Sequence, residues 1–284
     1  MNSRKIVVVT DSSAYIPEQA LGGLSIPVIP MWLIWGDDRF RDGVDIDPPT
    51  FYRRLQQSTV FPTTSQPSAG EFEEFFRQAG VDADAIVAVL ITSKLSGTVA
   101  SAHAARAQLP ELDIRIVDSL SVSMGLGFVT LAAARAAAAG KALDEVVTTA
   151  EAVRDRLNLL FVVDTLEYLH RGGRIGGAKW LVGTMLSIKP LLHFVDGTIE
   201  PLAQVRTKRK ATARLLEVVE ERLGGRQMAE VSVFDANSPG EGNAIAEQIK
   251  ERFGVSTVYR TVLSPAIGVH GGPGTIGVVF YTDS

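Results

Sequence analysis

The chain has 284 residues and a formal net charge of −4 at neutral pH; 46% of its residues are hydrophobic, 21% are charged and none is cysteine. These values are typical of a folded globular protein and exclude a long disordered chain. The acidic balance argues against nucleic-acid binding, which needs a basic face for the phosphates. Without cysteine, disulfides, thiolate catalysis and cysteine-bound zinc are excluded.

The length favours two domains of medium size. The first apolar run ends before Asp11 and is too short for the apolar region of a secretory signal. The weakly polar stretch 124–140 is interrupted by Arg135, and it falls short of the roughly 20 apolar residues that a membrane-spanning helix needs. We therefore expect a soluble, cytoplasmic protein.

In the first half of the chain, short runs of β-branched and apolar residues alternate with longer helical segments. The strand candidates lie at 5–10, 26–35, 85–92 and 113–119. Helices are expected to begin near Pro49, Ala69, Thr98 and Ser123, with another over 144–157. This alternation predicts an α/β domain over residues 1–160, in which a parallel sheet is covered by helices on both faces.

The pattern changes after about residue 160. Asp196 and Gly197 lie between two strand-like segments, and an Asp-Gly pair there favours a type I′ hairpin. Further elements are expected as a helix over 207–223, a strand over 229–234, a helix over 240–253 and a strand over 276–281. We predict a smaller α+β domain with a mixed or antiparallel sheet over 161–284, and a domain boundary between 155 and 170.

Hydroxyl side chains gather in turns that follow three of the predicted strands. They lie at 10–13, 92–98 and 118–121, and a fourth group occupies 62–68, between two prolines. In open α/β sheets ligands bind beyond the carboxyl ends of the strands, so these turns are expected to face one crevice. The alternative is that each serine or threonine caps the helix that follows it.

His270 lies in a segment, 268–274, that contains four glycines. Glycine permits close approach of the backbone to a ligand. The segment is therefore predicted as a loop in which His270 is a candidate ligand-binding residue. The alternative is a histidine with a structural role only.

Two basic segments lack a familiar signature. Residues 171–177 resemble a nucleotide loop, but a phosphate loop needs lysine where Ala178 stands, and the dinucleotide spacing also fails. The arginines of this segment are candidates for binding an anion or a partner; the alternative is a helix-ending turn. Basic residues at 206–214 open a predicted helix against its dipole, which points either to an acidic partner or to a solvated face.

Familiar catalytic and metal-binding patterns are absent from the sequence. It has no Gly-x-Ser-x-Gly elbow, and the histidines at 103, 170, 193 and 270 are scattered. The acidic residues at 37–47 lack the spacing of a calcium loop. We therefore expect no catalytic residue and no bound metal.

Six segments occur in the order seen in one known family: VTDSS at 9–13, TSQPS at 64–68, LSGT at 95–98, VDS at 117–119, RGGRI at 171–175 and the segment around His270. On these motifs, which span nearly the whole chain, the sequence resembles the DegV family. The resemblance implies a long-chain fatty acid, such as palmitate, stearate or oleate, in a tunnel between the two domains. It implies no other cofactor.

The resemblance also implies roles for individual residues. The hydroxyls of Thr64 and Ser96 hold the fatty-acid carboxylate near His270, and two adjacent residues are further candidates, Ser65 and Gly97. Three arginines match the family's surface for a partner, the catalytic subunit of a fatty acid kinase: Arg171, Arg174 and Arg206.

The implied function is that of a lipid-binding subunit rather than an enzyme. It presents the fatty acid for acyl-phosphate formation in phospholipid synthesis, and peripheral membrane contact is expected for lipid exchange. Two alternatives stay open. One is a stand-alone acyl hydrolase or transferase that uses Ser96 with His270. The other is a lipid-sensing regulator that has no kinase partner.

Overall fold

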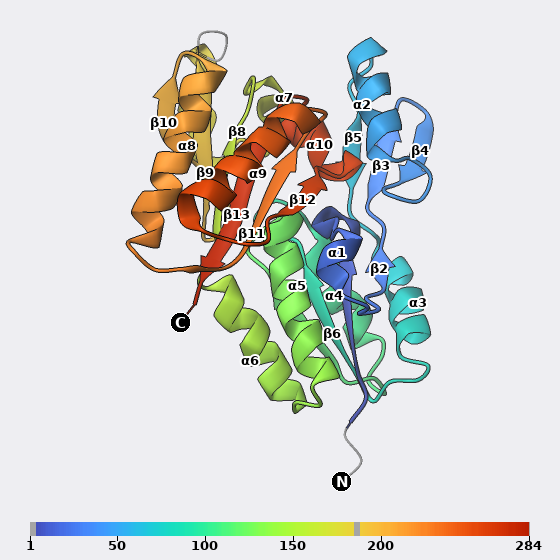
Figure 1. The fold of residues 1–284 in the computed structure, drawn as a ribbon. Coiled ribbons are helices and arrows are strands. Elements are labelled where there is room, and N and C mark those ends of the chain that lie inside the picture. The colour runs from blue at the N-terminus through green and yellow to red at the C-terminus, as the bar shows by residue number, and fades with distance from the viewer. Residues whose placement is uncertain (1–3, 185–187, 284) are drawn as a thin grey trace.

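The protein is described by a computed structural model over residues 4–184 and 188–283. In these residues the strands form a four-stranded, a six-stranded and a three-stranded sheet. Figure 1 shows the parallel strands and the helices of residues 69–154 below the C-terminal sheet and its own helices, while residues 32–65 lie beside the C-terminal half. The two sequence-predicted fold types are confirmed, since the first sheet is parallel and the second is mixed.

The N-terminal sheet has the order β2-β1-β6-β7 and is parallel throughout. Its strands are β1 (Ile6–Asp11), β2 (Val28–Ile29), β6 (Ala85–Leu90) and β7 (Ile114–Asp118). One face packs on α3 (Ala69–Ala79) and α4 (Thr98–Ala107), and the other on α5 (Ser123–Ala138) and α6 (Leu143–Arg154). Because successive side chains of a strand point to opposite faces, the apolar run of β6 is buried on both sides, as predicted.

The predicted single strand over 26–35 is wrong. Two prolines, Pro27 and Pro30, lack the amide hydrogen that a sheet ladder needs, and the segment breaks around Pro30. Its first part is β2; its second part, β3 (Trp32–Trp35), joins a separate antiparallel sheet with β4 (Asp38–Arg41) and β5 (Thr63–Ser65). Between β4 and β5 lies α2 (Pro48–Gln57), which Asp47 caps.

The C-terminal sheet has the order β10-β9-β8-β13-β11-β12, and only β11 and β12 are parallel. Its strands are β8 (Asn158–Val162), β9 (Lys189–Val195), β10 (Thr198–Val205), β11 (Met228–Asp235), β12 (Tyr259–Val262) and β13 (Ile276–Thr282). The β9–β10 hairpin is confirmed, with φ of 47° at Asp196 and 81° at Gly197. Strands β8 and β12 were not predicted.

The two faces of the C-terminal sheet pack differently. Its outer face packs on α8 (Lys208–Leu223) and α9 (Pro239–Phe253), both close to their predicted ranges. Its inner face joins the same core cluster as α5, where the Phe128 ring lies 5.7 Å from that of Tyr281. A continuous apolar core therefore connects the two halves of the chain. The division of the chain at residue 160 stays a prediction.

Short helices complete the structure. They are η1 (Ser12–Ala14), α1 (Glu18–Leu21), α7 (Glu167–Arg171), η2 (Gly176–Thr184) and α10 (Pro265–Gly271). His270 therefore lies in α10, and the predicted loop begins only after this helix. Within residues 4–184 and 188–283 no helix is both long and apolar enough to cross a membrane.

Candidate functional site

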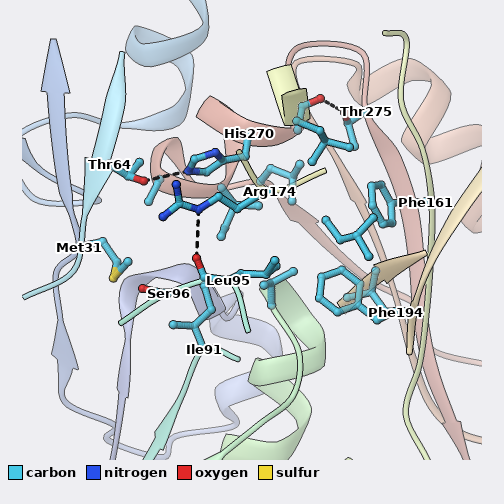
Figure 2. A pocket seen from close by; sticks show the side chains of 18 of the residues that line it. Met31, Thr64, Ile91, Leu95, Ser96, Phe161, Arg174, Phe194, His270 and Thr275 are labelled. Carbon is cyan, nitrogen blue, oxygen red and sulfur yellow. Dashed lines mark hydrogen bonds between the residues drawn. The ribbon is translucent and has the colours of Figure 1, made fainter. Parts of the chain in front are cut away.

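A cavity with an empty volume of about 750 Å³ lies between the carboxyl end of the parallel sheet and the inner face of the C-terminal sheet (Figure 2). The residues that line it come from both halves of the chain and are mostly apolar: Met31, Thr64, Gln66, Ile91, Leu95, Ser96, Val122, Leu159, Phe161, Leu169, Arg174, Phe194, Ile199, Phe234, Leu263, Ala266, Ile267, His270, Gly271 and Thr275.

Polar side chains gather at one end of this cavity. Thr64 comes from β5, Ser96 from the turn before α4, and His270 from α10. Thr64 Oγ1 and His270 Nε2 are 2.9 Å apart, and Ser96 Oγ lies 2.8 Å from Thr98 Oγ1. Three residues that are distant in the sequence thus line the same cavity, and Figure 2 shows them on one side of it. Their role in binding a carboxylate stays a prediction.

His270 is neutral at physiological pH. Burial, and then the nearby Arg174 guanidinium, lowers the pKa of His270 to about 4. Its Nδ1 is buried and has no hydrogen-bond partner among the described residues. An unpartnered N–H is rarer in buried sites than an unpartnered acceptor, which favours the proton on Nε2. Nε2–H then donates to Thr64 Oγ1, and the Thr64 hydroxyl hydrogen is left for an acceptor in the cavity.

The glycines after α7 shape the wall behind His270. A Cβ atom at Gly172 would lie 2.1 Å from His270 Nδ1, so only glycine leaves room for the ring. Arg174 then turns into the cavity, where Nε donates to the Leu95 carbonyl at 3.1 Å and Nη1 to the Gly172 carbonyl at 2.7 Å. No carboxylate of the described residues pairs with Arg174, so it supplies positive charge at the polar end of the cavity.

The far end of the cavity is apolar. Phe161 and Phe194 lie across from the polar group in Figure 2, with ring centroids 6.2 Å apart. Leu159, Leu169 and Phe234 add further apolar side chains to the lining from β8, α7 and β11. The cavity is therefore amphipathic, and this lining suits an apolar molecule with one anionic or polar end.

The other sequence-predicted site residues do not line this cavity. Ser65 donates its hydroxyl to the Gln66 carbonyl at 3.2 Å, and Gly97 is the N-cap residue of α4, where a Cβ would lie 2.8 Å from Gln66 Nε2. Arg171 is exposed, pairs with Glu167 at 2.7 Å and lies over the Phe61 ring. Arg206 is exposed, one residue before the N-cap of α8.

The expectation that three hydroxyl-rich turns face one crevice is wrong for two of them. Asp11 accepts from the Ser13 and Ile91 amides, Ser12 donates to Asp42 at 2.8 Å, and the first turn lines a different pocket. The turn at 118–121 lines a separate cleft. Of these three turns, the one at 92–98 reaches the cavity, through Leu95 and Ser96, and the fourth group at 62–68 reaches it through Thr64 and Gln66.

The basic start of α8 is compensated in part from within the protein, at Lys208 and Arg214. Lys208 Nζ lies 2.8 Å from Asp164 Oδ1 and 3.5 Å from Glu241, and it also donates to the Gly274 carbonyl. This residue therefore does not call for an outside anion. In the described parts of the chain, no three histidine, aspartate or glutamate side chains gather in a way that would hold a metal ion.

Comparison with known proteins places these features in a family. A family model described as "Uncharacterised protein, DegV family" matches residues 5–283. A DegV domain-containing protein of Streptomyces coelicolor is 39% identical over 279 residues, which cover 98% of each chain.

Solved structures agree with this match. A DegV family protein from Thermus thermophilus, whose structure is described as showing fatty acid binding, has a TM-score of 0.92 and 32% identity, covering 98% of this chain and 100% of its own. DegV of Bacillus subtilis, described as a fatty acid binding protein, has a TM-score of 0.91 and 31% identity, covering 99% and 100%. The chain therefore belongs to the DegV family.

Proposed function

We propose that this protein binds one long-chain fatty acid in the amphipathic cavity, with the carboxylate at Thr64, Ser96 and Arg174 and the acyl chain along the apolar wall. The observation that carries this proposal is the separation of polar and apolar lining on opposite sides of one cavity. The fatty acid binding described for the relatives from Thermus thermophilus and Bacillus subtilis supports it.

Burial of the acyl chain supplies most of the affinity. Each buried methylene contributes about 0.8 kcal/mol, so the roughly 14 to 16 methylenes of palmitate or stearate contribute on the order of 10 kcal/mol before the costs of binding. Oleate has a similar apolar surface. The head group then contributes less to the affinity than the acyl chain does, and it fixes the orientation of the ligand.

The polar side chains at one end of the cavity can donate hydrogen bonds to the carboxylate. The Thr64 hydroxyl, held by His270, and the Ser96 hydroxyl are neutral donors, and Arg174 adds a charge. A carboxylate accepts such bonds with both oxygens. Gln66 also lines this end and is an additional candidate donor that the sequence did not single out.

The carboxylate held in this way is a substrate for a partner. We infer that a fatty acid kinase transfers the γ-phosphoryl group of ATP to it: a carboxylate oxygen bonds to phosphorus, the bond to the β-phosphate oxygen breaks, and acyl phosphate and ADP result. Such a step depends on positioning, which this protein supplies. Exposed Arg171 and Arg206 are candidates for the surface that meets the kinase and its phosphates.

A variant of Ser96 separates the presentation of the carboxylate to the kinase from the binding of the fatty acid. Ser96→Ala should lower the rate of acyl-phosphate formation by the kinase more than it lowers fatty-acid retention, because tail burial is unchanged. Ser93→Ala, an exposed serine in the same turn, is the matched control. Equal phosphorylation of ligand on the Ser96 variant and on the wild type would contradict this role.

Lipid exchange requires contact with a membrane surface. The Trp180 side chain is 67% exposed in η2 and stands next to the exposed Lys179. An indole beside a cation suits the interface between headgroups and acyl chains. We infer peripheral contact there, which Trp180→Ser should weaken in a vesicle sedimentation assay; unchanged sedimentation would contradict it.

A stand-alone hydrolase is disfavoured by the geometry. Nucleophilic catalysis by Ser96 needs a base within hydrogen-bond reach. Here His270 Nε2 bonds Thr64, while Ser96 bonds Thr98. A lipid-sensing regulator is distinguished from a kinase subunit by whether purified kinase phosphorylates the bound ligand.

Binding itself is tested by filling the cavity. Ile267 lines the cavity, and Ile267→Trp should lower oleate affinity at least tenfold in a titration with delipidated protein. Ala244→Trp places the same side chain on the exposed surface of α9 as a control. If both variants bind oleate like the wild type, this cavity is not the binding site.

A further inference from the structure

A second cleft lies between the two halves of the chain, beside the tip of the β9–β10 hairpin. It has an empty volume of about 1000 Å³ and is formed by the turn before α5, the end of α6, the hairpin tip and α8. We call it the hairpin cleft; the side chains used below are Arg154, Arg222, His193 and two acidic residues at its rim, Asp155 and Asp196. Leu159 and Phe194 line both this cleft and the central cavity.

Arg222 is a half-buried cation without a counter-charge. Its Nη1 donates to Asn158 Oδ1 at 3.1 Å, and its Nη2 lies 2.7 Å from His193 Nδ1. Among residues 4–184 and 188–283 no aspartate or glutamate pairs with it, and burial lowers the pKa of Arg222. A partly desolvated charge with only neutral partners is costly, and an anion in the cleft would offset that cost.

His193 adds a donor and no competing charge. A guanidinium only donates, so His193 Nδ1 is the acceptor of the Arg222 bond and the ring proton sits on Nε2. Burial, and then Arg222, lowers the pKa of His193, so the ring is neutral at physiological pH. The Arg222–His193 pair therefore carries one net positive charge.

Arg154 brings a second guanidinium to the same cleft from the N-terminal half. Its Nε bonds Asp155 at 2.9 Å and its Nη1 lies 3.4 Å from Glu151. The Arg154 side chain is 20% exposed, whereas that of Asp155 is 64% exposed. Asp196 at the hairpin tip is exposed as well. The cations are therefore the better-buried charges of the cleft, and the carboxylates lie in solvent.

We propose that the hairpin cleft binds a small dianionic oxyanion of the phosphate-monoester class, with Arg222 as its main ligand and Arg154 as the second. Two guanidiniums that reach one cleft suit the several oxygens of a phosphate group. The site does not depend on the fatty-acid function proposed above, because its ligands are different side chains.

Such an anion would join the two halves of the chain next to the fatty-acid site. It bridges the end of α6 and α8, beside the hairpin tip. The Thr92 hydroxyl donates to the Gly197 carbonyl at 3.1 Å, which connects that tip to the turn carrying Ser96. Occupancy of the hairpin cleft therefore stiffens the frame of the central cavity.

Inorganic phosphate is the probe for this site. Isothermal titration of the full chain, in a phosphate-free buffer at constant ionic strength, should show one binding event. Arg222→Gln should weaken it at least tenfold and Arg154→Gln less, while Arg106→Gln, an exposed arginine on α4, should leave it unchanged. Absence of binding, acetate binding as tight as phosphate, or wild-type affinity in Arg222→Gln overturns the proposal.

A measurement on the wild-type protein covers the case in which the Arg222 variant does not fold. In a phosphate titration followed by NMR of the histidine rings, the His193 signals should shift while those of His103 on α4 stay in place. A titration that moves the His270 signals instead places the ion in the central cavity and overturns the assignment to the hairpin cleft.

Discussion

Because the pKa of His270 is low, we predict that the free energy of unfolding of this protein depends on pH. In the unfolded chain a histidine takes up a proton near its ordinary pKa of 6.5, whereas in the folded protein His270 stays neutral down to about pH 4. Between these values the unfolded state binds the extra proton, so the free energy of unfolding falls as pH falls from 6.5 towards 4. At pH 5 this loss amounts to about 2 kcal/mol.

The substitution His270→Gln isolates this contribution. Glutamine keeps a hydrogen-bonding group near Thr64 and does not titrate, so the difference in unfolding free energy between wild type and variant should shrink by about 2 kcal/mol from pH 8 to pH 5. The two proteins must be compared because buried Asp42 makes the free energy of unfolding rise as pH falls, which masks the contribution of His270 in the wild type alone. Both proteins contain Asp42, so its contribution cancels in the difference.

Urea unfolding of delipidated protein, followed by circular dichroism at pH 8, 7, 6 and 5, measures this difference. Delipidation is needed because a carboxylate beside His270 favours its protonated form. Parallel pH profiles for wild type and His270→Gln would refute the reasoning, since they would mean that His270 titrates in the folded protein as it does in the unfolded chain.

Three further predictions use matched variants. Burial, opposed by a hydrogen bond from Ser12, raises the pKa of Asp42 to about 7, so the free energy of unfolding falls as pH rises from 3.8 through 7. In urea unfolding, the stability of Asp42→Asn relative to wild type should therefore increase by about 2 to 3 kcal/mol from pH 5 to pH 8. A difference that stays constant with pH would contradict this. Thr64→Val removes one hydroxyl at constant shape and should raise the fatty-acid dissociation constant, measured by titration, about 5- to 30-fold. Thr63→Val, at an exposed position, should leave it unchanged. Equal affinities of Thr64→Val and wild type would show that Thr64 is not part of the head-group site. Gly172→Ala should lower the free energy of unfolding in urea by about 1 to 3 kcal/mol, because the added Cβ would contact the His270 imidazole. Gly70→Ala, where a Cβ meets nothing within 4 Å, should be neutral or stabilising. Similar effects at both positions would argue against this packing.

Most of the parallel sheet could be predicted because β6 and β7 are short runs rich in apolar and β-branched residues that alternate with helical segments. Strand β8 was missed since it follows α6 after a short polar connection with no glycine or proline to mark the change, so the predicted helix was extended to residue 157. Strand β12 has only four residues, too few for a periodic signal.

Helix α10 was missed for a different reason. Its proline and glycines are typical of a loop, yet Pro265 occupies the first turn, where a missing amide hydrogen costs nothing, and Ser264 caps the helix by accepting from the Ile267 amide. Gly268 is required by packing, because a Cβ there would lie 2.5 Å from the Tyr52 hydroxyl. Tertiary contacts thus override the local preference of these residues.

The polar end of the candidate site was predicted on family resemblance, through Thr64, Ser96 and His270. The apolar end could not be predicted, because Leu159 and Phe161 lie in β8, which the sequence did not reveal, and Phe194 is typical of an ordinary strand. Only the packing of the C-terminal sheet onto the N-terminal half makes these residues a cavity wall. The sequence predicts Arg174 at a partner surface, whereas its side chain lines the cavity. It does so because Gly172 lets the chain pass close behind His270.

The central claim is that the cavity holds a fatty acid. Protein purified from a bacterial host, denatured and extracted, should release close to one equivalent of a long-chain fatty acid on mass spectrometry, and the Ile267→Trp variant should release much less. Wild-type protein that comes out empty and takes up no added palmitate, stearate or oleate would contradict the account and leave the cavity to a ligand of another class.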